Sequence, residues 1–474
     1  MNAVPPPMPD YASRFLAQRA AFAADRYPPL PVRRERLARL LGLIDDNEPA
    51  LIAAVDADFG GRSAQETRIA ELHVTRSAIK YARRHVARWM RTRRVATELA
   101  FLPATNRLAP QPLGVVGIVS PWNYPIQLAL CPLVGALAAG DRALLKPSEL
   151  TPRTSALLAE LIGKYFEPGL VSVVLGDGEI GKAFVALPFD HLLFTGSTAV
   201  GRQVAAAAAV NLTPITLELG GKSPAILDAS CDLAKASARI AAGKLLNAGQ
   251  TCVAPDYLLV PRGQAAAVAS AIAAAMKRLY PTLAANPDYT AIISDRHRAR
   301  LVGLVAEARD AGAEIVEVNP ANENFDGGRK LAPSLVVGAP PSTRVMREEI
   351  FGPVLPIVEY DDVDDAIGAV NRGDRPLALY WFGRDAARRQ RVLRETIAGG
   401  VTVNDCLLHF VQEGQPFGGV GASGVGAYHG EWGFRTFSKL KPVFRQSALS
   451  GFPLLRPPYG KVTDWALGAL RRLP

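Results

Sequence analysis

Cys252 occupies a segment whose composition suits a nucleophile. It ends the run Asn247-Ala-Gly-Gln250-Thr-Cys252, a glycine-containing stretch that follows an expected helix. A thiolate can attack an electrophilic carbon, although a lone cysteine is more often a small buried apolar residue. The remaining cysteines lack such a context and are interpreted as packing residues: Cys131, Cys231 and Cys406. Cys252 is therefore the candidate nucleophile, and it needs a base and an oxyanion site close by.

Two other positions could supply those roles. Glu218 lies between two leucines at the end of an apolar run, where desolvation would raise the pKa of its carboxyl toward the range of a general base. The alternative for Glu218 is an ordinary salt bridge with Lys222. Asn123 follows the first expected parallel strand, and its side-chain amide can donate a hydrogen bond to an oxyanion.

Three glycine-containing segments resemble phosphate-binding sites. Residues 194–201 lie at an expected strand-to-helix turn, where backbone N–H groups and the helix dipole can hold a pyrophosphate; a simple glycine turn is the alternative. Two other stretches approach the P-loop pattern of NTPases. The first ends in Ala183 where a hydroxyl residue is required, and the second begins with Thr216 where glycine is required. An NTPase is therefore rejected.

The elements that must position these residues follow an alternating pattern. Residues 33–95 are expected to be helical. Beyond residue 113, β-rich runs alternate with helical segments, with strands at 114–120, 143–147, 171–175, 191–195 and 214–219, and helices at 127–139, 151–165 and 178–186. A second such region, 222–415, has helices at 233–248, 264–279 and 296–311, and strands at 257–260, 355–359, 377–382 and 400–403. The alternation predicts an α/β fold with parallel sheets and a ligand at the carboxyl ends of the strands.

Composition excludes several classes of protein. With 474 residues, 49% hydrophobic and 21% charged, the chain is near the globular average and is not disordered. The apolar run 125–140 is shorter than the span of about 20 residues that a membrane helix needs. No signal peptide is evident, and four cysteines without a C-x-x-C pair indicate neither a disulfide framework nor a metal site. A cytoplasmic location is predicted.

The net charge of +10 is compatible with a nucleic acid or an anionic membrane as partner. The densest basic cluster has apolar residues at helical spacing beside it, which favours a solvated helix face: Arg83, Arg84, Arg88, Arg91, Arg93 and Arg94. No nucleic-acid-binding motif accompanies it. Residues 462–473 predict an amphipathic C-terminal helix with Thr463 as N-cap. We expect that helix to dock on the protein's own surface or on a partner subunit; membrane contact is the minority alternative.

Seven short motifs, taken in order, closely resemble the aldehyde dehydrogenase superfamily. They are PWN at 121–123, KPSE at 146–149, FTGST at 194–198, LELGGK at 217–222, GQTC at 249–252, EEIFGP at 348–353 and PFGG at 416–419. The resemblance runs nearly end to end. It implies a Rossmann-like parallel-sheet cofactor domain, a second α/β catalytic domain and a small bridging β-hairpin. The implied boundaries are 1–92 and 111–221 for NAD(P) binding, 222–416 for catalysis, 93–110 and 417–446 for bridging and oligomerisation, and 447–474 for the tail.

The resemblance also implies residue roles. Cys252 would attack the aldehyde, Asn123 and the Cys252 backbone N–H would stabilise the oxyanion, and Glu218 would activate the water that hydrolyses the thioester. Residues implied in cofactor binding are Trp122, Lys146, Glu149, Gly196, Ser197, Gly201, Leu219, Glu349 and Phe351. Among them, Glu149 favours NAD, because a carboxylate repels a 2′-phosphate, although class 3 members with this residue often accept NADP. No metal is implied.

Longer sequence segments narrow the resemblance to one class of aldehyde dehydrogenases. GQTCVAPDY (249–257), VNDCLLH (403–409) and PFGGVGASGVGAYHG (416–430) are similar to class 3 enzymes, which implies a homodimer. LLFTGSTAVG (192–201) and YPTLAANPDYTAI (280–292) resemble the bacterial coniferyl aldehyde dehydrogenases of that class. In some fatty-aldehyde members a C-terminal helix covers the substrate entrance.

The expected function is NAD(P)-dependent oxidation of an aromatic, coniferaldehyde-like aldehyde to its acid, through a thiohemiacetal and a thioester. The alternative is the same chemistry on medium- or long-chain aliphatic aldehydes. Two alternatives come from other classes of protein. A binding protein that has lost catalysis is one, but the presence of Cys252, Glu218 and Asn123 argues against it. A membrane-peripheral protein is the other, and only the basic cluster and the tail suggest it.

Overall fold

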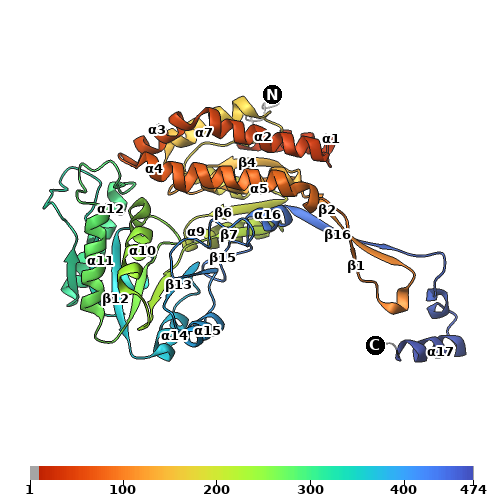
Figure 1. Ribbon diagram of the computed structural model, residues 1–474. Helices are drawn as coiled ribbons and strands as arrows, with labels where there is room; N and C mark the ends of the chain where they lie inside the picture. Colours follow the sequence, from red (N-terminus) through yellow and green to blue (C-terminus); the bar gives the residue numbers. More distant parts are fainter. Residues whose placement is uncertain (1–9, 473–474) are drawn as a thin grey trace, which may run out of the picture.

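The computed structural model describes residues 10–472, and two large sheets and a projecting arm organise them (Figure 1). The first sheet has six strands in the order β15-β7-β6-β3-β4-β5. They are β3 (Val115–Val119), β4 (Arg142–Lys146), β5 (Val171–Val173), β6 (His191–Thr195), β7 (Ile215–Glu218) and β15 (Gly424–Val425). All pairs are parallel except β15, which runs antiparallel to β7. Strands β4, β5 and β6 are buried throughout, as a parallel sheet covered on both faces requires.

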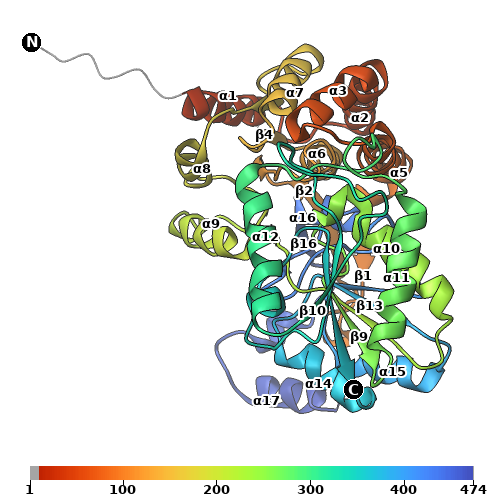
Figure 2. The same ribbon diagram turned by 90° about the vertical axis from the view of Figure 1, so that its left-hand side faces the viewer.

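Helices cover both faces of this sheet. One face packs under α6 (Gln127–Ala139), which is buried along its whole length and apolar all round. Outside α6 lie the helices of the N-terminal layer, seen at the top of Figure 2: α2 (Leu30–Asp46), α3 (Glu48–Phe59), α4 (Ala64–Glu66), the π-helical turn η1 (Thr67–His73), α5 (Val74–Trp89) and α7 (Pro152–Tyr165). The opposite face carries α1 (Asp10–Ala24), α8 (Gly178–Val185) and α9 (Thr198–Val210).

The second sheet has seven strands in the order β10-β11-β12-β9-β8-β13-β14. They are β8 (Pro224–Leu227), β9 (Tyr257–Pro261), β10 (Glu314–Glu317), β11 (Ser334–Val337), β12 (Val354–Tyr360), β13 (Ala378–Phe382) and β14 (Gly400–Val403). Only the pairing of β10 with β11 is antiparallel among these described strands. Side chains alternate between two clusters: Leu258 and Val260 pack on one face and Leu259 on the other.

The helices of this second region lie on both sides of its strands, and α11 and α12 stand on either side in Figure 2. They are α10 (Leu233–Leu245), η3 (Leu246–Gly249), α11 (Ala265–Leu279), α12 (Asp295–Asp310), α13 (Arg344–Arg347), α14 (Val363–Arg372) and α15 (Ala386–Glu395). The cavity described below is lined by the last residues of β6 and β7 and by the first residues of β8 and β9.

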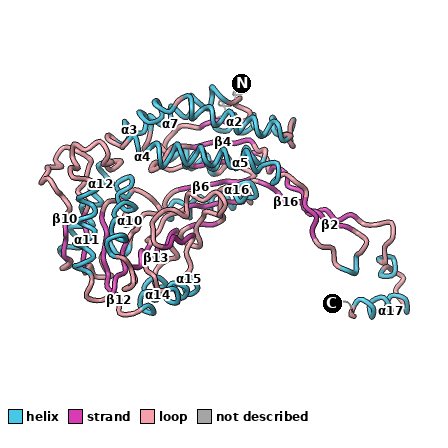
Figure 3. The backbone as a smooth tube through the Cα atoms, viewed as in Figure 1, coloured by secondary structure: helices cyan, strands magenta, loops and turns pink. Residues whose placement is uncertain are grey.

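A third, three-stranded sheet extends away from both regions (Figures 1 and 3). It contains β1 (Arg93–Val95), β2 (Thr105–Pro112) and β16 (Ser438–Arg445), all antiparallel, with β2 in the middle. The short helices η2 (Leu99–Phe101) and α16 (Gly430–Thr436) adjoin it. Beyond the sheet, η4 (Phe452–Leu455) lies next to α17 (Lys461–Leu470) (Figure 1). We call residues 93–112 and 438–472 the arm.

The predicted α/β fold with parallel sheets is confirmed, and most expected strands and helices lie within two residues of their observed bounds. The expected helix 233–248 is wrong at its end: α10 stops at Leu245, because Asn247 and Ala248 adopt left-handed conformations with φ of 55° and 51°. Helix α1 was not predicted. Among residues 10–472, no helix is both long and apolar enough to cross a membrane.

Two surface predictions have different outcomes. The basic cluster forms a solvent-exposed face of α5 and the start of the arm, over the buried side chains of Val86 and Trp89, as expected. The C-terminal helix exists, but Thr463 is not its N-cap: α17 begins at Lys461, and Gly460 occupies the cap position. Its predicted apolar stripe is only partly covered by this chain: Ala466 is buried and α17 contacts η4, whereas Val462 and Trp465 are exposed. Leu473, the last residue of that stripe, lies outside the described residues.

Candidate active site

A cavity of about 1200 Å³ lies between the two sheets, at the carboxyl ends of the strands of the first. The three residues expected to carry chemistry line it, together with most of those expected to bind the cofactor. Asn123 follows β3, Glu218 ends β7, and Cys252 follows the irregular turn η3. The fold therefore brings the predicted nucleophile, base and oxyanion donor together from three separate segments.

Cys252 faces the predicted base. Its Sγ donates a hydrogen bond to Oε1 of Glu218 at 3.4 Å. Burial, followed by the neighbouring carboxyls of Glu218 and Glu349, raises the pKa of the Cys252 thiol well above its ordinary value. The resting sulfur is therefore a neutral thiol, and Glu218 is the group placed to receive its proton.

Glu218 is held in a buried hydrogen-bonded position, with 1% of its surface exposed. Its Oε2 accepts hydrogen bonds from the hydroxyls of Thr195 at 3.2 Å and Tyr428 at 3.1 Å. Burial raises the pKa of the Glu218 carboxyl to about 7, and the hydrogen bonds oppose that rise. A carboxyl with this pKa can both accept and release a proton near neutral pH.

The alternative salt bridge between Glu218 and Lys222 is not formed. Lys222 instead pairs with Asp256, and its Nζ donates to the backbone carbonyls of Val345 at 2.9 Å and Glu348 at 3.1 Å. Glu218 is thus free of a cationic partner that would hold its pKa low.

The oxyanion donors lie beside the nucleophile. Asn123 is buried, and its Nδ2 donates to the carbonyl of Gln250 at 3.2 Å, two residues before Cys252. Asn123 and Cys252 line the same cavity. The oxyanion roles of the Asn123 amide and the Cys252 backbone N–H stay predictions.

The other end of the cavity suits a dinucleotide. Gly196 and Ser197 form the turn between β6 and α9, and Ser197 caps α9 by accepting from the Val200 N–H at 3.4 Å. A helix N-terminus of this kind favours a pyrophosphate. At Gly201 a Cβ would come within 2.6 Å of the Leu219 side chain, so glycine allows α9 to pack closely against the end of β7.

Glu349 and Phe351 enter the same cavity from the second region. The Oε1 atom of Glu349 is buried without a hydrogen-bond partner, and burial raises the pKa of this carboxyl to about 8. Phe351 adopts a φ of 54°, and the centroid of its ring lies 5.3 Å from the centroid of the Trp122 ring. An unpaired buried oxygen that can accept from a ribose hydroxyl, beside an aromatic pair, fits a nicotinamide nucleoside.

Lys146 and Glu149 lie at the end of β4, next to β3, but do not line the cavity itself. The Nζ of Lys146 is buried 3.7 Å from Oε2 of Glu149, whose side chain is half-exposed. Both stay predictions as adenosine-ribose ligands.

Sequence reasoning missed the groups that hold the catalytic residues. Thr195 and Tyr428 both lie inside motifs that were recognised, yet nothing in the motifs shows that their hydroxyls converge on Glu218. Tyr428 is 210 residues from Glu218 along the chain, and β15 brings its segment against β7.

Comparisons with known proteins agree with this geometry. The profile described as "Aldehyde dehydrogenase family" matches residues 10–443. A probable coniferyl aldehyde dehydrogenase of Pseudomonas aeruginosa is 49% identical, over 94% of this chain and 93% of the relative. Aldehyde dehydrogenase family 3 member A2 of Mus musculus is 42% identical, over 90% of this chain and 87% of the relative.

Solved structures show the same fold. A substrate-bound Staphylococcus aureus AldH superimposes with a TM-score of 0.92 at 36% identity, covering 98% of this chain and all of that one. Pseudomonas syringae AldA, an indole-3-acetaldehyde dehydrogenase solved with NAD⁺, has a TM-score of 0.83 at 25% identity, covering 92% of this chain and 89% of that one.

The chain belongs to the aldehyde dehydrogenase family, and the resemblance inferred from its motifs is confirmed. Its residues at the cavity suit a nicotinamide cofactor, as the family requires.

Proposed function

We propose that this protein oxidises aromatic aldehydes of the coniferaldehyde type to carboxylic acids, with NAD as the favoured cofactor. The hydrogen-bonded contact between Cys252 and Glu218, beside the amide of Asn123, carries the proposed reaction. The substrate class is supported by similarity to a probable coniferyl aldehyde dehydrogenase over nearly the whole chain. Glu149 supports NAD, because a carboxylate at the adenosine ribose would repel a 2′-phosphate.

In the proposed mechanism, Glu218 takes the proton of the Cys252 thiol, and the sulfur adds to the aldehyde carbon. Asn123 Nδ2 and the Cys252 N–H donate to the oxygen of the resulting thiohemiacetal. A nicotinamide dinucleotide bound in the cavity supplies the hydride acceptor. Loss of hydride from the thiohemiacetal carbon leaves a thioester, and Glu218 releases the thiol proton to solvent. Glu218 then takes a proton from water as the water attacks the thioester carbon. The C–S bond breaks, the acid leaves, and Glu218 returns its proton to the Cys252 sulfur.

The runner-up is a medium- or long-chain aliphatic aldehyde. Residues that line the cavity give it both apolar and charged walls, among them Leu128, Met346, Arg372 and Arg375. Similarity to aldehyde dehydrogenase family 3 member A2 keeps this candidate open.

We further propose that the protein is a cytoplasmic homodimer joined through the arm, and that the domain boundaries follow the resemblance. Support comes from the exposed apolar side chains of the arm and from β16, an edge strand of its sheet. Four free cysteines suit a reducing compartment.

The experiment is a substrate panel run with both cofactors. We expect kcat/KM to rank coniferaldehyde and benzaldehyde above hexanal and decanal, and NAD above NADP. A ranking led by decanal would replace the proposed substrate with the aliphatic alternative. No NADH or NADPH from any of the four aldehydes would overturn the proposed function itself.

A further inference from the structure

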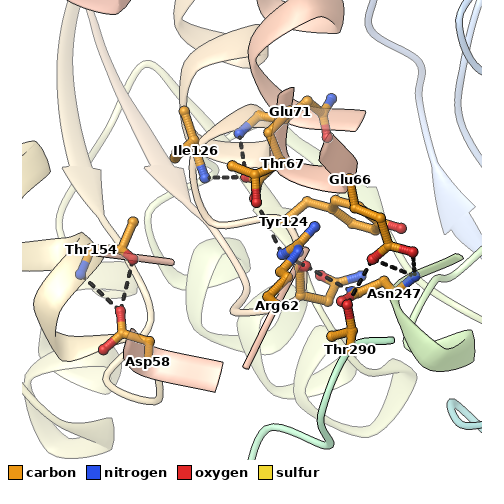
Figure 4. Close-up of polar contacts among 12 residues, drawn as sticks. Asp58, Arg62, Glu66, Thr67, Glu71, Tyr124, Ile126, Thr154, Asn247 and Thr290 are labelled. Atoms are coloured by element: carbon orange, nitrogen blue, oxygen red, sulfur yellow. Dashed lines mark hydrogen bonds and ion pairs between the residues drawn. The ribbon is translucent and has the colours of Figure 1, made fainter. Parts of the chain in front are cut away.

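A short segment of the N-terminal layer lies against both loops of the active site (Figure 4). We define residues 120–126, which contain Asn123, as the oxyanion loop, and residues 247–252 as the nucleophile loop. We propose that Arg62, Glu66 and Glu71 are positioning residues that hold these two loops in register for catalysis. The proposal rests on the function proposed above, because it concerns the oxyanion site of that reaction.

Arg62 fixes the backbone of the oxyanion loop. Its Nη1 donates to the carbonyl of Asn123 at 2.9 Å, and Nδ2 of Asn247 donates to the same carbonyl at 3.0 Å. The guanidinium lies over the ring of Tyr124, 4.9 Å from its centroid. The oxyanion loop is therefore held by one residue of the N-terminal layer and one of the nucleophile loop, while the Asn123 amide points toward Gln250.

Glu71 holds the end of the same loop. Its Oε2 accepts from the backbone N–H groups of Ile126 at 2.7 Å and Gln127 at 3.2 Å, where α6 begins. Its Oε1 forms an ion pair with Nη1 of Arg62 at 3.2 Å, and both side chains are fully buried. A buried pair of this kind keeps its geometry, because loss of either partner would leave an uncompensated charge.

Glu66 holds the nucleophile loop. Both of its carboxylate oxygens accept from the Asn247 N–H at 3.1 Å, and Oε2 also accepts from the Thr290 hydroxyl at 2.7 Å. Asn247 is in a left-handed conformation, which a non-glycine residue keeps only where its surroundings fix it. The bond from Glu66 thus acts at the point where α10 ends and the chain turns toward Cys252.

The backbone of this segment explains how two acids reach two loops. Glu71 is five positions after Glu66 and lies within the π-helical turn Thr67–His73, which Glu66 directly precedes. Because π-helical hydrogen bonds join residues five apart, residues at that separation share one face, which an α-helix would not allow. The π turn directs both carboxyls to the side where the loops meet.

Asp58 supplies a matched control from the same layer. Like Glu66 and Glu71 it is a buried carboxylate that accepts backbone N–H groups, those of Arg153 at 3.0 Å and Thr154 at 2.8 Å. Figure 4 shows it on Thr154, away from both loops. Asp58→Asn should therefore weaken the fold in a comparable way without moving the oxyanion site.

The experiment compares Arg62→Lys, Glu66→Gln and Asp58→Asn with wild type. Three readouts are taken: the rate of the pre-steady-state NADH burst, the Kd for NAD, and the rate at which iodoacetamide alkylates Cys252. Alkylation builds no oxyanion and needs no aldehyde, so it reports on the thiol alone. The aldehyde used is whichever the wild type oxidises fastest, so that an error in the proposed substrate leaves this test intact.

We expect the burst rate to fall at least about 10-fold in Arg62→Lys and Glu66→Gln. Removing one oxyanion donor lowers kcat roughly 10²–10³-fold, and displacing the Asn123 amide should cause part of that loss. In Arg62→Lys, the rate of Cys252 alkylation and the Kd for NAD should stay within about twofold of wild type. In Asp58→Asn, the burst rate, the alkylation rate and the Kd for NAD should all stay within about twofold. Burst rates in Arg62→Lys and Glu66→Gln that match Asp58→Asn would overturn the proposal. Equal losses of burst and alkylation in Arg62→Lys would also overturn it, because they would indicate general collapse of the site.

Discussion

The cleft and the arm differ in how their side chains find partners. In the cleft, the predicted catalytic groups find their partners within the chain: the Glu218 carboxyl contacts Cys252, Thr195 and Tyr428. In the arm, large apolar side chains face solvent, with Phe444 50%, Tyr459 71% and Trp465 68% exposed. One chain therefore brings the predicted catalytic residues together by itself, whereas the arm leaves apolar side chains exposed, as the dimer proposed above requires.

The largest effect should follow from removing the nucleophile in the cleft. Cys252→Ala is expected to lower kcat by at least about 10³-fold, because no other group can form the thioester. Fluorescence titration with NAD should show binding within a few-fold of wild type. Near-normal NADH production by this variant would mean that the cleft does not work through this sulfur.

In the cleft, the structure brings together the residues that the motifs singled out. Asn123 follows β3, Glu218 ends β7 and Cys252 follows η3, and all three line one cavity. Their supporting groups were not predictable, because Tyr428 and Arg62 reach the site from segments distant in sequence, and motif spacing does not encode side-chain direction.

In the arm, the apolar periodicity of the sequence predicted the C-terminal helix but not the surface against which that helix packs. The apolar spacing in residues 462–473 predicted α17 correctly, yet its start and its packing depend on surfaces that local sequence does not specify. The end of α10 shows the same limit: Asn247 leaves the helix where Glu66, far away in sequence, binds its N–H.

The second prediction separates the two chemical steps in the cleft. Glu218→Gln should slow the NADH burst, because the Cys252 thiol loses its base. It should lower steady-state kcat further, by roughly 10²–10⁴-fold, the contribution of a general base, so that a burst still precedes the steady state. In the wild type, kcat should rise with pH through about 7, because the Glu218 carboxyl has a pKa raised to about 7 and acts as a base only when ionised. Stopped-flow and steady-state pH profiles measure both. An inflection that persists unchanged in Glu218→Gln would assign it to another group.

The third prediction concerns the arm. Val443 and Phe444 are exposed on the edge strand β16, so the double variant Val443→Asp with Phe444→Asp should convert a dimer into monomers in analytical ultracentrifugation. Val210→Asp, which places a charge on another exposed apolar position at the end of α9, is the control and should leave the mass unchanged. A monomeric wild type would contradict the proposed role of the arm.

The smallest effect should come from the tail. Deleting residues 462–474 should change the ratio of kcat/KM for coniferaldehyde and decanal by about 10-fold if α17 of one chain borders the cleft of another. One methylene in an apolar pocket is worth about 1–3 kcal/mol, or roughly 10- to 200-fold, and a contact at the entrance lies at the low end. NAD saturation curves provide the internal control and should not move. An unaltered ratio would limit α17 to a role outside substrate selection.

The most direct test of the central claim is the chemical state of Cys252 during turnover. Glu218→Gln enzyme, mixed with coniferaldehyde and NAD and quenched in acid, is digested and analysed by mass spectrometry. The account predicts that the peptide containing Cys252 carries the acyl group of the corresponding acid, in an amount that matches the NADH burst. A burst of NADH with an unmodified Cys252 peptide, or with the acyl group on Cys131, Cys231 or Cys406, would contradict it.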